Sequence, residues 1–326
     1  MSQYTNVHNI PLALAVWLVA DDYDYVDKEN YISVTTLMKP LRMIILGSRK
    51  VTPESPQALP DLSDLAARAL GTSLHDSIEK AWKNHYKKSL SILGYSKSVI
   101  DMIRINPEPE EIKPGIIPVY FEQRAFKQVG KWTVGGKFDL VAEGIVHDNK
   151  STTAYTWKFG GKEDDYSKQG SLYRWLNPEK ITEDFIRINY IFTDWQRATA
   201  RKDPEYPQNR LLADEYPLTS IEETQEWVEN KLALIEKYWD AKDEDIPECT
   251  DKELWKGEEY YKYYSDPNKT ERATKANFES NAQAIHYFQI EKQGKGLLKK
   301  FGGEVKRCGY CDAVSHCKQA KRVYSE

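Results

Sequence analysis

Long apolar runs are scarce in this chain of 326 residues. The run from Ile10 to Ala20 is too short to cross a bilayer, which takes about 20 apolar residues of helix, and no cationic flank precedes it. Asp21 and Asp22 follow at once, where a secretory signal would carry small residues for cleavage. We therefore expect a cytoplasmic protein in which this run is a buried strand or helix.

An excess of charge is also lacking. The 46 Lys and Arg residues against 50 Asp and Glu residues give a formal net charge of −4, so a surface for nucleic acid has to be a local patch. Hydrophobic residues make up 40% of the chain and aromatic residues 12%, which excludes a disordered protein. The length suits one large domain or two modest ones.

Cysteine is scarce and unevenly placed. The four cysteines all lie in the last quarter of the chain, at Cys249, Cys308, Cys311 and Cys317. Without a secretory signal, disulfides are not expected, and a Cys-x-x-Cys pair with two further thiols indicates a metal site. Tetrathiolate zinc and an iron–sulfur cluster both suit four cysteines.

Strand patterns surround the most informative stretch, Val134 to Tyr173. Apolar residues alternate through residues 131–141 and again through residues 119–126, which predicts extended strands. Glu143-Gly144 predicts a turn, after which Ile145 resumes the extended pattern. The central stretch is therefore expected to contain neighbouring strands joined by a short turn.

This arrangement places charged side chains close together. Asp139 lies near the end of one predicted strand, while Asp148 and Lys150 point the same way on the next, because side chains two apart on a strand share a face. Two carboxylates and a lysine so placed can hold a divalent cation and activate water against a phosphodiester. We interpret this stretch as a nuclease centre.

Helical patterns lie on both sides of these strands. Through residues 62–90 apolar residues recur every four positions, and His75 lies beside that apolar face, where an imidazole can bind a metal. Residues 96–115, rich in Pro and acidic residues, predict a loop, and residues 185–193 predict a strand. Ser220 and Glu223 predict a capping box that opens a helix.

These elements resemble the PD-(D/E)XK nuclease superfamily, in which an Asp and then a D/E-x-K follow one another on a hairpin. Asp139 and the run Asp148-Asn149-Lys150 match those elements. The resemblance narrows to the RecB-like branch, which adds an upstream His and a downstream Q-x-x-x-Y, matched by His75, Gln169 and Tyr173. It implies an α/β fold with a restriction-endonuclease-like core, a central mixed β-sheet flanked by helices, and added helical segments at both ends.

The resemblance also implies a role for each matched residue. One or two Mg²⁺ or Mn²⁺ ions would be held by His75, Asp139, Asp148 and the backbone carbonyl of Asn149. Lys150 would orient or help deprotonate the attacking water and offset charge in the transition state. Gln169 and Tyr173 would position the DNA backbone or Lys150.

The cysteine spacing carries a second resemblance. Cys308-x₂-Cys311-x₅-Cys317 is similar to the iron–sulfur staple of RecB-like nucleases such as the CRISPR-adaptation exonuclease and the AddB nuclease subunit. In those relatives the remaining cysteine precedes the nuclease core, whereas Cys249 follows it, and His316 is an alternative fourth ligand. The resemblance implies a [4Fe–4S] cluster that staples the C-terminus, with Zn²⁺ as the alternative.

Basic residues outside the centre are candidate DNA contacts, with solvated surface as the competing interpretation. They are Arg197, Arg201, Lys202, Lys299 and Lys300. The chain is expected to comprise an N-terminal segment that packs on the core (1–60), the nuclease core (61–215) and a helical C-terminal region with the four cysteines (216–326).

Together these features predict a divalent-metal-dependent deoxyribonuclease. The resemblance implies exonuclease action on single-stranded DNA or DNA ends in recombination, replication or phage DNA processing, with a helicase or recombinase as a candidate partner. Two alternatives stay open. One is a non-catalytic nucleic-acid-binding module with a zinc-stapled nuclease-like fold, and the other is a structure- or sequence-specific endonuclease.

Overall fold

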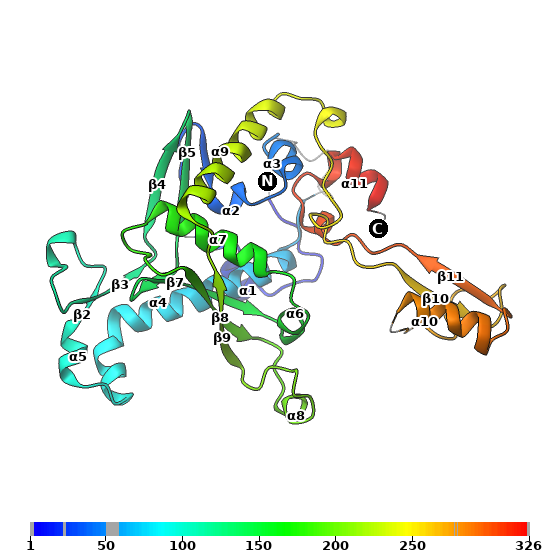
Figure 1. The fold of residues 1–326 in the computed structure, drawn as a ribbon, viewed down its shortest axis with the longest axis horizontal. Helices are drawn as coiled ribbons and strands as arrows, with labels where there is room; N and C mark the ends of the chain where they lie inside the picture. The colour runs from blue at the N-terminus through cyan, green and yellow to red at the C-terminus, as the bar shows by residue number, and fades with distance from the viewer. Residues whose placement is uncertain (1–2, 22–23, 50–58, 277, 279, 325–326) are drawn as a thin grey trace. The chain divides into compact units, whose positions relative to one another are not determined.

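The computed structural model describes residues 3–21, 24–49, 59–276, 278 and 280–324. These residues fall into two units (Figure 1). The first consists of the described residues within 1–38 and 51–233, and the second of those within 39–50 and 234–326. The division expected from the sequence stays a prediction; its segments are 1–60, 61–215 and 216–326.

A six-stranded sheet is the framework of the first unit. Its strand order is β2-β3-β6-β7-β8-β9. β7 and β8 pair in parallel, as do β2 and β3, and the remaining neighbours pair antiparallel. The bounds are β2 Ile103–Ile105, β3 Ile117–Phe121, β6 Leu140–Ala142, β7 Ile145–Thr152, β8 Phe185–Phe192 and β9 Leu211–Pro217. The strand predicted at residues 185–193 is therefore confirmed.

Helices pack against this sheet. The long α4 (Ala66–Ile92) reaches it through Trp82, whose ring lies 5.7 Å from that of Phe121, and through Leu90 in the same buried cluster. α7 (Glu163–Leu176) packs against β8. The expected α/β architecture, a mixed sheet flanked by helices, is confirmed.

The first unit also contains a second sheet, which has three strands. Its order is β1-β5-β4, with bounds β1 Tyr31–Ser33, β5 Trp132–Lys137 and β4 Arg124–Val129. The stretch 131–141, expected as one strand, therefore breaks after Lys137, and the stretch 119–126 breaks between β3 and β4. The apolar alternation could not reveal the first break because its parity continues unchanged through Trp132, Val134, Phe138 and Leu140.

The turn between β6 and β7 is the one expected at Glu143-Gly144. Both residues take positive φ angles, 52° and 78°, as a tight turn between antiparallel strands requires. A Cβ on Gly144 would also lie 2.1 Å from Thr182 Oγ1, so glycine is needed for space as well. This turn fixes the register that places Asp148 and Lys150.

Residues 96–115 differ from the expected loop. They contain α5 (Lys97–Met102), whose first turn is capped by Ser96 Oγ accepting from the Val99 N–H, and then β2. Ile100 and Ile103 are buried in the cluster beneath α4. This burial stabilises regular structure in a segment whose later prolines favoured a loop.

The apolar run near the N-terminus forms α1 (Leu12–Val19). Leu18 is buried against Leu62 and Ala69, but Leu12 is 78% exposed, so the expectation of a buried element was wrong for most of the run. Within the described residues, no helix combines the length and apolar character needed to cross a membrane.

The remaining helices of the first unit are short, apart from α9, within which the boundary to the second unit falls. They are α2 Val34–Leu37, α6 Ala154–Phe159, α8 Arg197–Ala200 and α9 Ile221–Tyr238. The predicted capping box opens α9: the Ser220 N–H donates to Glu223 Oε2 and the Glu223 N–H donates to Ser220 Oγ.

The second unit contains short helices and one antiparallel ribbon. Its elements include α3 Leu41–Gly47, β10 Tyr260–Tyr264, α10 Asn281–His286, β11 Leu297–Phe301 and α11 Lys318–Val323. α10, which continues in a π-helical turn at Tyr287–Glu291, lies alongside the ribbon (Figure 1).

The ribbon continues beyond its regular strands. The Gly257 N–H donates to the Glu304 carbonyl and the Arg307 N–H to the Leu254 carbonyl. A Cβ on Gly303 would lie 1.6 Å from the Gly257 carbonyl oxygen, so the two backbones can meet only at glycine. The ribbon thereby connects β10 and β11 to the segment that carries Cys308.

Candidate metal centres

Glu122 lies in the short connection between β3 and β4, and Asp139 lies in the short connection between β5 and β6. β3 pairs with β6 in the six-stranded sheet, whereas β4 pairs with β5 in the three-stranded sheet. The two connections therefore form a strand break where the chain passes between the sheets. Within the break the Glu122 N–H donates to the Asp139 carbonyl at 3.1 Å, and the Phe138 N–H donates to the Gln123 carbonyl at 3.3 Å. Glu122 takes the left-handed conformation, with φ 52°. A shared interruption of two strands therefore positions two carboxylates.

Asp139 is held from a helix and from the next strand. Nδ1 of His75, on α4, lies 3.1 Å from Asp139 Oδ2, and the Asn149 N–H on β7 donates to the same oxygen at 2.9 Å. Candidate ligand atoms of His75, Glu122 and Asp139 lie within 4.8 Å of one another. One imidazole with two carboxylates is a donor set that suits a divalent ion such as Mn²⁺.

Asp148 and Lys150 form a buried ion pair on β7. Lys150 Nζ lies 2.5 Å from Asp148 Oδ2, and the Asp148 side chain is 3% exposed. The other carboxylate oxygen accepts from Gln169 Nε2 on α7 at 2.8 Å, and that amide also donates to the Tyr173 hydroxyl at 3.2 Å. These contacts hold the Lys150 ammonium in one place.

Burial and neighbouring charges set the protonation of the centre. Burial raises the pKa of Asp148 and of Glu122, whose carboxylate also pairs with Lys137 at 2.6 Å. Burial would raise the pKa of Asp139 as well, but the hydrogen bond and charge of His75 outweigh it and lower this pKa below its usual value. The same hydrogen bond raises the pKa of His75.

Lys150 stays an ammonium group in this environment. Burial favours its neutral amine, but the charge and hydrogen bond of Asp148 are stronger and raise the pKa of Lys150 above its ordinary value. A permanently charged lysine beside carboxylates can offset negative charge that develops on a reacting phosphate.

The structure places the predicted residues of this centre in two contact groups. The first joins His75, Asp139 and the Asn149 N–H, and the second joins Asp148, Lys150, Gln169 and Tyr173. Asp148 is not in the compact donor set of His75, Glu122 and Asp139, and its two oxygens contact Lys150 and Gln169 instead. The roles of the predicted residues, and the role of the Asn149 carbonyl, stay predictions. Sequence reasoning missed Glu122, whose one signal is an acidic residue between two apolar runs. Its partnership with Asp139 depends on the paired strand break, which the sequence pattern does not contain.

The predicted basic contacts lie elsewhere. Arg197 begins α8, and Arg201 and Lys202 follow it in the first unit. Lys299 and Lys300 lie on β11 in the second unit. All five side chains are exposed, and their role in DNA binding stays a prediction.

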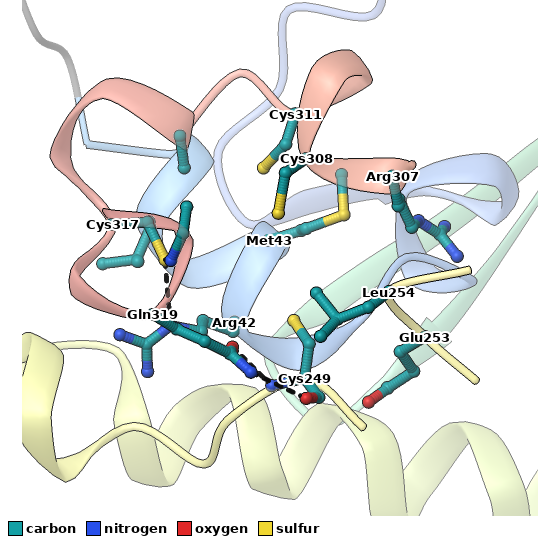
Figure 2. Close-up of a pocket in the computed structure, with 13 residues that line it drawn as sticks. Arg42, Met43, Cys249, Glu253, Leu254, Arg307, Cys308, Cys311, Cys317 and Gln319 are labelled. Carbon is teal, nitrogen blue, oxygen red and sulfur yellow. Dashed lines mark hydrogen bonds between the residues drawn. The ribbon is translucent and has the colours of Figure 1, made fainter. Parts of the chain in front are cut away.

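The four cysteines line one pocket in the second unit (Figure 2). Cys308 lies in the helical turn Arg307–Tyr310, Cys311 follows that turn, and Cys317 immediately precedes α11. Cys249 enters from another part of the chain and shares the pocket with them. All four are free thiols.

Two buried polar side chains fix the segments that carry the cysteines. Arg42, on α3, donates from Nε to Cys317 Sγ at 3.2 Å and from Nη1 to the carbonyls of Asp243 and Ile246, and it pairs with the Asp243 carboxylate. Gln319 clamps the backbone of Cys249: its Oε1 accepts from the N–H and its Nε2 donates to the carbonyl, both at 2.8 Å.

The alternative ligand His316 is engaged differently. Its Nε2 lies 3.1 Å from the Leu46 carbonyl oxygen, and the ring is not among the groups that line the cysteine pocket. Cys249 is therefore better placed than His316 to complete the set of four.

Burial disfavours the thiolate form of three of the cysteines, so a metal that binds them has to displace protons. Burial raises the pKa of Cys249 to about 12 and also raises the pKa of Cys308 and of Cys311. Four sulfur donors that line one pocket can hold either a tetrathiolate zinc ion or an iron–sulfur cluster.

No family model and no curated protein match the chain. Among solved structures it is similar to the protein SSO0001, with 17% identity and a TM-score of 0.36 over 65% of this chain and 79% of that one. It is also similar to a phage-related exonuclease from Haemophilus somnus 129PT, with 14% identity and a TM-score of 0.29 over 64% of this chain and 93% of that one.

Proposed function

We propose that the chain is a divalent-metal-dependent deoxyribonuclease. The supporting observation is the convergence of His75, Glu122 and Asp139 on one donor set, beside the buried ion pair of Asp148 and Lys150. Ionisable groups with shifted pKa values are commoner at functional sites than elsewhere, and His75, Glu122, Asp139, Asp148 and Lys150 all have shifted pKa values.

Each residue has a distinct task in this proposal. His75, Glu122 and Asp139 hold an Mg²⁺ or Mn²⁺ ion, together with the expected ligands Asp148 and the Asn149 carbonyl. When bound, the ion lowers the pKa of coordinated water and stabilises charge on the phosphate.

The lysine and its supports act beside the ion. Lys150, held by Asp148, orients the attacking water and offsets charge in the transition state. Gln169 fixes the second oxygen of Asp148, and Tyr173 fixes the Gln169 amide. Gln169 and Tyr173, one turn apart on α7, thus support the ion pair of Asp148 and Lys150.

The substrate follows from the RecB-like resemblance of the sequence. It is single-stranded DNA or a DNA end, degraded by an exonuclease in recombination, replication or phage DNA processing, with a helicase or recombinase as partner. The four cysteines hold a [4Fe–4S] cluster in this proposal, and Zn²⁺ is the alternative. Iron and sulfide analysis of anaerobically purified protein, together with its colour, separates the two.

A cleavage assay tests the nuclease. Purified full chain is incubated with Mn²⁺ and either linear or circular single-stranded DNA, and Asp139→Asn serves as the inactive variant. We expect linear DNA to be degraded, circular DNA to be spared and the variant to be inactive. Cleavage of circular DNA would favour an endonuclease, and metal-independent binding without cleavage would favour a non-catalytic module.

A further inference from the structure

The β10–β11 ribbon has two unlike faces. Directly opposite residues of an antiparallel pair share a face, and residues two apart along a strand share it too. The register pairs Tyr260 with Phe301 and Lys262 with Lys299, so these four side chains lie on one face. The alternate pairs, which lie on the other face, are Tyr261 with Lys300 and Tyr263 with Leu298.

The face that carries Tyr263 is occupied by the protein itself. Tyr263 is 3% exposed, its ring meets that of Tyr287 edge-on at 5.3 Å, and its hydroxyl donates to the Lys295 carbonyl. On the other face, Tyr264 pairs with Leu297 and is buried, so that end of the face is covered as well. The end that carries Tyr260 and Lys299 is exposed and can receive a partner.

Aromatic rings and ammonium groups lie together on that face. The rings of Tyr260 and Phe301 are stacked, with centroids 5.3 Å apart and planes at 9°. Lys262 Nζ lies 5.0 Å from the Phe301 centroid, and Lys299 Nζ lies 5.2 Å from it. Tyr260 remains 42% exposed. Flat rings offer stacking surfaces to bases, and the lysines offer charge to phosphates.

A second group of the same kind lies on the ribbon nearer to Cys308. The Arg307 guanidinium lies 4.5 Å from the Trp255 ring, which is 6.2 Å from that of Tyr310. Trp255 is 42% exposed and Tyr310 is 78% exposed. Two aromatic and cationic groups along one ribbon suit a ligand that repeats rings and negative charges along its length.

We propose that the β10–β11 ribbon is a binding surface for single-stranded DNA. Tyr260 and Phe301 stack on bases, Lys262 and Lys299 contact phosphates, and Trp255 with Arg307 forms a second contact. A single strand fits better than a duplex because duplex bases stack on each other and do not offer their faces to protein rings. The inference rests on the proposed function in one respect: the bound strand is taken to be the substrate of the nuclease.

Binding is measured by fluorescence anisotropy of a labelled oligothymidylate with the full chain and no added divalent cation, so that cleavage does not interfere. Tyr260→Ala and Phe301→Ala should each weaken binding about ten-fold, as expected for loss of one base–ring contact. Tyr260→Phe, which keeps the ring, should bind like the unchanged protein. A duplex of the same length should lose little affinity in any of these variants.

Lys299 and Lys300 provide a matched pair of neighbouring lysines on opposite faces. Lys299→Gln should reduce the slope of log affinity against log salt by about 0.7, the value for one phosphate contact on a single strand. Lys300→Gln should reduce it less. Equal salt slopes in Lys299→Gln and Lys300→Gln would overturn the proposal. So would undiminished single-strand affinity in a Tyr260→Ala protein with normal thermal unfolding, or a loss of affinity that is confined to duplex DNA.

The two proposals fail separately. Ribbon-dependent binding without metal-dependent cleavage would contradict the nuclease and leave the ribbon as a single-strand binding surface. Normal cleavage with single-strand binding that is indifferent to Tyr260, Phe301 and Lys299 would contradict the ribbon and leave the nuclease in place.

Discussion

The two candidate centres gather their ligands by different means. In the first unit, backbone pairing across a strand break positions Glu122 and Asp139, and His75 and Lys150 already balance the buried carboxylates. In the second unit, the cysteines come from short turns and loop segments, and burial raises the pKa of the Cys249, Cys308 and Cys311 thiols. We therefore expect the carboxylate centre to keep its arrangement without a metal, and the cysteine centre to depend on the metal that we propose for it.

The largest expected effect is loss of the metal from the cysteine centre. Cys317→Ser should abolish metal binding and unfold the second unit, because a structural metal site can contribute on the order of 10 kcal/mol to folding. Hydrogen exchange of residues 243–264 and 297–320 measures this, and the first unit should stay protected. Cys249→Ser is the strictest test of the ligand set. Full metal content and unchanged stability in that variant would show that Cys249 is not a ligand.

Arg42→Met should destabilise the second unit by about 3–5 kcal/mol, because it leaves the buried side of Asp243 without its cation and removes the donor to Cys317. The matched control is Arg322→Met, which breaks an exposed ion pair with Glu248 and should cost less than about 1 kcal/mol. Denaturant unfolding of the metal-loaded proteins compares them. Similar values for the two variants would show that Arg42 is not a structural clamp.

Lys150→Ala should lower the rate of DNA cleavage at least about 100-fold while DNA affinity is retained, because the ammonium acts on the transition state. Lys83→Ala, which breaks an ion pair with Glu79 on the surface of α4, is the control and should cleave normally. Single-turnover cleavage with Mn²⁺ gives both rates. Equal rates in the two variants would exclude the proposed role of Lys150.

The smallest expected effect is a pH dependence of stability without divalent ions. The folded pKa of His75 lies above 6.5, so its protonated form adds stability that is fully present below pH 6.5 and is lost as the pH rises through the folded pKa. The lowered pKa of Asp139 acts at the other end, where stability is lost as the pH falls below 3.8. The stability difference between the unchanged protein and His75→Asn should therefore shrink on raising the pH from about 5 to about 8. A difference that grows over this range would contradict the ion pair.

The parts of the carboxylate centre that the sequence predicted have local signals. Asp148 and Lys150 are two apart on a strand, Gln169 and Tyr173 are four apart on a helix, and His75 lies on a periodic helix. Glu122 escaped prediction because its position depends on two strands breaking together between sheets. Alternation alone describes one strand and does not identify the sheet to which it belongs.

The cysteine centre likewise has a part with a local sequence signal and a part that depends on the fold. Cys308 and Cys311 form a local motif, so the sequence indicated a metal site. Arg42, in contrast, lies 275 positions from Cys317, and only the folded chain reveals its contact with the sulfur. The aromatic face of the ribbon likewise depends on the register between β10 and β11, which joins residues far apart in sequence.

The central claim, a divalent-ion site built on the strand break, is tested most directly by Mn²⁺ binding. Free Mn²⁺ can be counted by electron paramagnetic resonance during titration of the full chain. Glu122→Gln and Asp139→Asn should each weaken binding by at least about ten-fold, the scale seen when groups around a metal are removed. Glu143→Gln, which changes an exposed carboxylate in the neighbouring hairpin turn, should bind as the unchanged protein does. Unaltered Mn²⁺ affinity in both Glu122→Gln and Asp139→Asn would contradict the account.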